Sequence, residues 1–100
     1  MDINIKTKNI TLNSALQEFI DDKIGSLDKF LNGIEPAIVE VDISRTTNHH
    51  NKGDVFRAEV QIEVPGKLLR SESTKEDLRV AIVDVKNELQ TQIKKYKETR

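Results

Sequence analysis

The sequence predicts an α+β fold of two layers, in which a four-stranded mixed sheet carries two helices on one face. Two kinds of apolar spacing predict it. Four short segments alternate apolar and polar residues with the period of a β-strand, and two longer segments repeat apolar residues with the period of an α-helix. In chain order these segments read β-α-β-β-β-α. Each helix has one apolar stripe to bury, and the apolar faces of the strands offer the surface that buries it.

The four strand segments share one apolar and one polar face, and they are residues 3–8, 37–44, 56–64 and 67–73. Pro65-Gly66 joins the last two as a tight turn, because proline presets φ and glycine accepts positive φ. A polar loop, residues 46–54, separates the second strand from the third. The alternation places four carboxylates together on the outer face of the sheet: Glu40, Asp42, Glu59 and Glu63.

The first helix is expected to run without interruption over residues 14–31. Either Asn13 or Ser14 can cap its first turn, and Gly33 ends it because glycine tolerates the left-handed backbone. Lys23 lies inside the apolar arc of this helix. Its stem could pack at the edge of the core with the ammonium in solvent, or the ammonium could be held toward a phosphate ligand. The sequence leaves both interpretations open.

The second helix opens at Thr74, its predicted cap, and carries an apolar stripe from Leu78 to Tyr96. At about 100° per residue, six basic side chains share one flank of this helix. They are Lys75, Arg79, Lys86, Lys94, Lys97 and Arg100. Lys95 lies on another side with most of the acidic residues. Such sorting could be an ordinary solvated surface, but a row of cations on a rigid helix is well shaped to follow a phosphate backbone.

The net charge of −1 conceals this asymmetry. Residues 75–100 carry seven basic and five acidic side chains, a net charge of +2, whereas the preceding 74 residues carry nine basic and twelve acidic ones, a net charge of −3. Any electrostatic attraction for nucleic acid therefore belongs mainly to the second helix. The outer face of the sheet is acidic and lacks outward aromatic residues, which argues against RNA stacked on the strands.

Composition bounds the remaining possibilities. One hundred residues suffice for one core, so residues 1–100 are expected to form a single domain. The absence of cysteine excludes disulfides, thiolate nucleophiles and sulfur-ligated metals. No apolar run approaches the roughly 20 residues that span a bilayer, and the first residues do not resemble a signal peptide. We expect a cytoplasmic protein with no membrane partner.

Candidate chemistry is sparse. Carboxylates are plentiful, but no acid, base and nucleophile are grouped, and no glycine-rich phosphate loop is present, so we expect no enzyme, cofactor or small-molecule substrate. His49-His50 invites a metal, but two histidines without a third ligand at a recognised spacing are weak support for one. The aromatic residues all fall in core-facing phase: Phe19, Phe30, Phe56 and Tyr96.

Two stretches of the chain resemble a known family. Lys8-Asn9-Ile10 with Ala15-Leu16, followed by Lys23-Ile24 and Leu27-x-Lys29-Phe30, looks like the opening of ribosome hibernation-promoting factors, the ribosome-associated translation inhibitors. The stretch from Gly66 through Glu76-Asp77-Leu78 to Gln92-Ile93-Lys94-Lys95-Tyr96-Lys97 resembles their close. The resemblance covers nearly the whole chain. Asp22 and Ser26 depart from it, since many relatives carry lysine there.

The resemblance implies a domain similar to double-stranded RNA-binding domains. It further implies binding to ribosomal RNA between the head and platform of the small ribosomal subunit, where messenger and transfer RNA would lie. We expect the protein to be monomeric off the ribosome. Matching positions give Lys23, Lys29, Lys67, Arg70, Lys94, Lys95 and Lys97 as candidate contacts. The helical wheel adds Lys75, Arg79 and Lys86.

Two alternatives to a ribosome hibernation factor stay open. The same basic helix would suit a free-standing double-stranded RNA-binding or RNA-chaperone domain. The acidic outer face of the sheet would suit a protein-interaction module.

Overall fold

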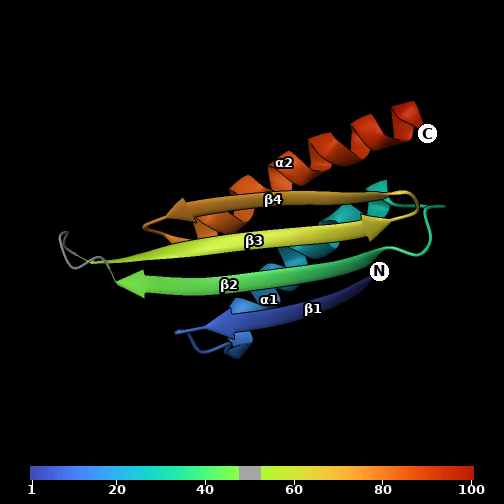
Figure 1. Ribbon diagram of the computed structural model, residues 1–100. Helices are drawn as coiled ribbons and strands as arrows, with labels where there is room; N and C mark the ends of the chain where they lie inside the picture. Colours follow the sequence, from blue (N-terminus) through green and yellow to red (C-terminus); the bar gives the residue numbers. More distant parts are fainter. Residues whose placement is uncertain (48–52) are drawn as a thin grey trace.

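The computed structural model describes residues 1–47 and 53–100. The elements follow one another in the predicted β-α-β-β-β-α order, with a short 3-10 helix, η1, added after the first helix (Figure 1). Their bounds are β1 Asp2–Lys8, α1 Ser14–Gly25, η1 Ser26–Phe30, β2 Ile38–Thr47, β3 Asp54–Val64, β4 Lys67–Lys75 and α2 Leu78–Thr99.

The strands form one mixed sheet in the order β1-β2-β3-β4. β1 pairs with β2 in parallel, and the other neighbouring strands pair antiparallel. Both helices cover the same face of the sheet, behind the strands in the view of Figure 1. The predicted fold class is therefore confirmed. The β3–β4 hairpin turns at Pro65-Gly66 as expected, with Gly66 at a φ of +79°.

The core lies between the helices and the inner face of the sheet. Inward-facing strand residues such as Val39, Val41 and Ile62 are at most 1% exposed, as alternation required. They meet the apolar stripes of the helices, whose fully buried members are Ile20, Ile24, Leu27, Ala81, Val85, Leu89 and Ile93. One connected apolar cluster thus joins both layers.

The start of α2 differs from the prediction. The ladder between β3 and β4 continues past Thr74, which pairs with Arg57, to Lys75, so the chain is still in the sheet at Thr74 and the helix begins only at Leu78. Asp77 caps α2 instead, and its carboxylate accepts a hydrogen bond from the Arg79 backbone N–H at 2.9 Å. Lys75, assigned to the helix from the sequence, consequently belongs to β4.

The first helix also differs, because it does not run unbroken to Leu31. It ends at Gly25, and the chain tightens into η1. The hydroxyl of Ser26 donates to the Lys23 carbonyl at 2.6 Å, a local hydrogen bond that competes with regular helical bonding at this point. Of the two possible caps Asn13 is the one used, since its side-chain oxygen accepts the Leu16 N–H at 2.8 Å.

The predicted loop over residues 46–54 is longer than the observed connection between β2 and β3. β2 continues through Thr47 and β3 begins at Asp54, because the antiparallel register of the two strands extends to that pair. His49 and His50 lie outside the described residues. None of the helices in the described part of the chain is long and apolar enough to cross a membrane.

Gln92 of α2 ties that helix to the edge strand of the sheet. Its Nε2 donates to the Arg70 carbonyl at 2.8 Å, and its Oε1 accepts the Arg70 backbone N–H at 3.2 Å. β4 is an edge strand, so these groups of Arg70 have no strand beside them to bond. One side chain therefore satisfies a donor and an acceptor of the edge and fixes α2 against β4.

We expect Gln92→Ala to lower the free energy of unfolding by about 1 kcal/mol, because a typical net hydrogen bond contributes roughly 0.5–1.5 kcal/mol. The measurement is urea denaturation followed by circular dichroism. Asn87→Ala is the matched control, since it removes an exposed amide from the same helix and improves helix propensity. Equal decreases in the free energy of unfolding of the two variants would contradict the role assigned to Gln92.

Candidate nucleic-acid interface

α2 lies beside α1 and η1 on the sheet and contacts both. Two partly buried aromatic rings sit where these helices meet. Around Phe19, the Lys23 ammonium of α1 lies 5.7 Å from the ring centroid and the Arg79 guanidinium of α2 lies 5.8 Å from it. A cation within about 6 Å of a ring is attracted to the negative face of the π system. Each helix thus supplies one cation to the same ring.

The arrangement repeats further along at Phe30. The Lys29 ammonium of η1 lies 5.3 Å from that ring centroid, and the Lys94 ammonium of α2 lies 6.0 Å from it. Each of the two rings thus has one cation from α1 or η1 and one from α2. Together they form a surface that we call the interhelical seam. Its residues are Phe19, Lys23, Lys29, Phe30, Arg79 and Lys94.

The cations of the seam are almost uncompensated. Lys23 has a carboxylate nearby, that of Asp22 at 3.6 Å, and this side chain of Lys23 is 39% exposed. Within residues 1–47 and 53–100, no carboxylate comes within ion-pair distance of Lys29, Arg79 or Lys94. Like charges held together without counter-charges create a positive potential that attracts a polyanion.

Lys86 and Lys97 continue the row along α2. Lys86 lies two turns beyond Arg79 and two turns before Lys94, and it is half-buried, whereas Lys97 is exposed near the end of the helix. Neither has an ion-pair partner among the described residues. Lys86 therefore lies within the length of the seam, and Lys97 continues it toward the C-terminal end of the helix.

Other candidates from the sequence lie elsewhere. Arg70 is on the outer face of the sheet, where its guanidinium pairs with Glu59 and also with Glu72 at 3.3 Å. Arg57 joins the same two carboxylates. Because its charge is already compensated by neighbours on the opposite side of the sheet from the helices, Arg70 does not extend the seam.

Lys75, Lys67 and Lys95 are also separate from the seam. The ammonium of Lys75 lies 3.8 Å from the Asp84 carboxylate, an ion pair that its place in β4 rather than in α2 makes possible. Lys67 is exposed at the start of β4, and Lys95 is exposed on α2, one position beyond the flank that carries Lys94. The structure thus divides the predicted basic residues into a clustered set and a dispersed one.

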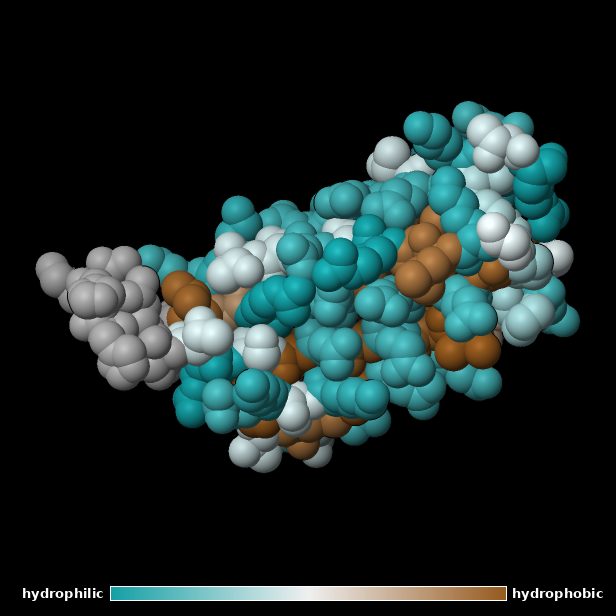
Figure 2. Space-filling view, viewed as in Figure 1, coloured by the Kyte–Doolittle hydropathy of each residue, from teal (hydrophilic) through white to brown (hydrophobic). Residues whose placement is uncertain are grey.

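The outer face of the sheet is less uniformly acidic than alternation suggested. Register places Asp42 beside Glu59 and Glu40 beside Gln61, as expected. Glu59 is only 12% exposed, however, because Arg57 and Arg70 cover it. Figure 2 shows this face, on which hydrophilic side chains predominate. Two of its carboxylates, Glu59 and Glu72, are thus compensated by arginines.

The role of the aromatic residues was the part that sequence analysis missed. Tyr96 is buried as expected, at 6% exposure. Phe19 and Phe30 pack against the core but are only partly buried, and each contacts two cations. The contact between Phe19 and Lys23 could have been predicted, because residues four positions apart in a helix lie on the same face. The contacts of Arg79 and Lys94 with these rings could not be predicted from spacing, because they join different helices.

Groups of three or more potential metal-ligating residues are absent from the described residues. What the arrangement offers is a rigid positive surface with two aromatic rings, carried on helices that the sheet holds in place. That defines a small α+β protein with a basic, helix-borne face suited to nucleic acid.

Comparison with known proteins identifies the family. The chain matches, over residues 3–100, the family model described as "Sigma 54 modulation protein / S30EA ribosomal protein". It belongs to this family. It is 33% identical over 96 residues to the ribosome hibernation promotion factor of Lactococcus lactis subsp. cremoris (strain MG1363), and 32% identical over 89 residues to that of Staphylococcus aureus (strain COL). The family resemblance seen in the sequence is confirmed.

The two matches cover most of this chain but less than half of each relative. The matches include 94% and 89% of this chain but only 48% and 44% of the relatives, so the chain spans about half their length. Among solved structures, the N-terminal domain of Thermus thermophilus Protein Y is similar with a TM-score of 0.82 at 28% identity, covering 96% of this chain and 99% of that one. A ribosomal subunit interface protein from Coxiella burnetii shares the fold with a TM-score of 0.76 at 18% identity, covering 99% and 100%.

The uncompensated seam predicts that a polyanion stabilises the protein. Tripolyphosphate at about ten times its dissociation constant should add about 1.4 kcal/mol to the free energy of unfolding. For a domain of this size each kcal/mol raises Tm by about 4–8 °C, which calorimetry at low ionic strength measures.

The double variant Lys29→Gln/Lys94→Gln should lose most of that rise in Tm. Arg70→Gln is the control, because the charge of Arg70 is already paired on the other face, and its rise in Tm should match that of the unaltered protein. The same rise in all three proteins would show that tripolyphosphate does not bind at the seam.

Proposed function

We propose that this chain binds the small ribosomal subunit through the interhelical seam, lies in the channel for messenger and transfer RNA, and keeps ribosomes translationally inactive. The observation that carries the proposal is the seam itself, in a member of a family whose matched relatives are named ribosome hibernation promotion factors. Occupancy suffices for this function, so the protein acts without chemistry of its own, as a cytoplasmic binding protein.

The fold supports such a role because it fixes the backbone positions from which the cationic side chains project. α1, η1 and α2 rest on one continuous core, so the cations are carried by a rigid scaffold and not by a flexible tail. Binding then loses little conformational entropy in the scaffold. The partner of such a surface is the phosphate backbone of ribosomal RNA, since phosphates provide most of the affinity in protein–nucleic acid contacts.

Within this proposal the ten basic residues predicted from the sequence contribute unequally to RNA binding. Six lie on the seam or its continuation and would contact RNA first: Lys23, Lys29, Arg79, Lys86, Lys94 and Lys97. Lys67, Arg70, Lys75 and Lys95 would make outer contacts or none, because they lie apart from the seam and two of them are ion-paired.

The test is co-sedimentation with purified small ribosomal subunits across a series of salt concentrations. Lys86→Gln/Lys94→Gln should bind more weakly and should reduce the slope of log affinity against log salt by about 2, because each lost phosphate contact reduces it by about 1. The control Lys6→Gln/Lys8→Gln removes the same charge from β1, where these exposed lysines point away from the helices. Equal effects of the two variants would contradict the assignment of the seam.

A free-standing double-stranded RNA-binding domain is the second candidate, favoured by the same placement of cations on two helices above a sheet. The two functions differ in what they require of the RNA. Binding an isolated RNA duplex as tightly as the small subunit, at about 0.15 M salt, would favour the second candidate. Preference for the subunit, together with inhibition of translation in a reconstituted system, would favour the first.

A further inference from the structure

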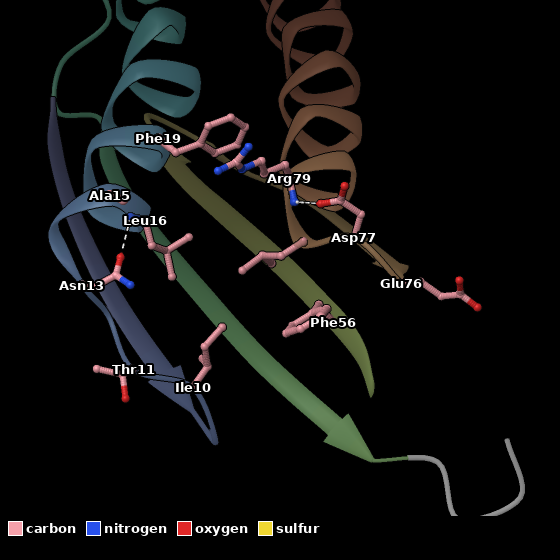
Figure 3. A pocket seen from close by; sticks show the side chains of 11 residues that line it. Ile10, Thr11, Asn13, Ala15, Leu16, Phe19, Phe56, Glu76, Asp77 and Arg79 are labelled. Atoms are coloured by element: carbon pink, nitrogen blue, oxygen red, sulfur yellow. Dashed lines mark hydrogen bonds between the residues drawn. The ribbon is translucent and has the colours of Figure 1, made fainter. Parts of the chain in front are cut away.

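A groove with a volume of about 520 Å³ opens where α1 and α2 both begin (Figure 3). This size falls within the range of roughly 300–1,000 Å³ that is usual for small-ligand sites. The groove shares Phe19 and Arg79 with the interhelical seam, so it continues the seam at one end. Nothing in the phosphate-binding role of the seam requires a groove there.

Six of the eleven residues that line the groove are apolar. Leu16 of α1 and Leu78 of α2 both line it, and Ile10 lies toward its lower end in Figure 3. Phe19 comes from the helical layer and Phe56 from β3 in the sheet, and both rings are partly exposed. Partly exposed aromatic rings lining a cleft are the surfaces on which unpaired nucleobases stack.

Among the polar residues that line the groove, Asn13 and Arg79 supply hydrogen-bond donors. Asn13 uses its side-chain oxygen to cap α1, which leaves its Nδ2 amide without a partner among the described residues. The Arg79 guanidinium lies against the Phe19 ring at the mouth of the groove. Two carboxylates also line it, but that of Asp77 accepts the Arg79 N–H and that of Glu76 points away in Figure 3.

We propose that this groove holds one unpaired purine base of the RNA that the seam binds. Donors at the groove match the acceptor N7, which both purines carry and pyrimidines lack, and the apolar walls match the faces of the base. Continuity with the seam places the phosphates on either side of that base near cations. This inference deepens the proposed function and depends on it for the identity of the RNA.

The probe that tests the groove by itself is guanosine 5′-monophosphate, with ribose 5-phosphate as the control that lacks a base. In methyl NMR spectra of the protein, the nucleotide should shift the signals of Leu16 and Leu78 and give nuclear Overhauser contacts from the base proton H8 to Phe56. Ribose 5-phosphate should leave those methyl signals in place, and uridine 5′-monophosphate should bind more weakly. Equal shifts with all three compounds would overturn the proposal.

Matched substitutions separate the groove from the rest of the seam. Phe19→Leu should weaken binding of the nucleotide by about fivefold or more, the lower end of what one base–aromatic stack provides. Phe30→Leu makes the same change at the other ring of the seam, outside the groove, and should weaken nucleotide binding less than Phe19→Leu does. Asn13→Ser keeps a capping oxygen but removes the amide donor, so it should weaken binding without unfolding α1.

The outcomes distinguish this inference from the proposed function. If the nucleotide shifts no groove methyl while the protein still co-sediments with small subunits, the groove does not hold a base and the inference alone fails. If an apolar peptide shifts the groove signals and the nucleotide does not, the groove is a protein-docking site and the inference also fails. Binding of the nucleotide without subunit binding would leave the base site standing and overturn the proposed function.

Discussion

The packing of α2 across β3 and β4 is the interaction on which the rest of this structure depends. Leu89 and Ile93 are fully buried against the sheet. The Tyr96 hydroxyl donates to the Pro65 carbonyl at 2.7 Å, and Gln92 bonds the backbone of Arg70. Together these contacts fix the rotation of α2 about its own axis. Since a helix carries its faces rigidly, burying this stripe brings Arg79 and Lys94 to the rings of the helical layer beside it.

The aromatic residues stand at the boundary between the core and the basic surface. Phe19 and Phe30 pack against the core on one side and contact cations on the other. The negative face of each ring offsets part of the repulsion between the cations gathered around it, yet contributes no counter-charge. The surface therefore keeps its attraction for a polyanion, which a carboxylate at the same position would have cancelled.

Arginines are ion-paired on the outer face of the sheet, whereas most of the described cations on the helical side are not. On the outer face, Arg57 and Arg70 pair with Glu59 and Glu72, so positive and negative groups compensate each other at short range. On the helical side the cations of the seam have little such compensation. A protein of net charge −1 can thus still gather cations on one surface, because Lys29, Arg79 and Lys94 have no ion-pair partner among the described residues.

Periodicity and local turn chemistry predicted the order of elements, the buried faces and the turn at Pro65-Gly66. They also predicted the basic flank of α2, except for Lys75, which belongs to β4. Local rules failed at Thr74, where pairing with β3 kept the chain extended and left Asp77 to cap α2. Which cations lie close together follows from the packing of the helices and not from local sequence. Phe19 and Arg79 lie 60 positions apart in the chain, and no local spacing could bring them together. The packing of two layers on a common core does.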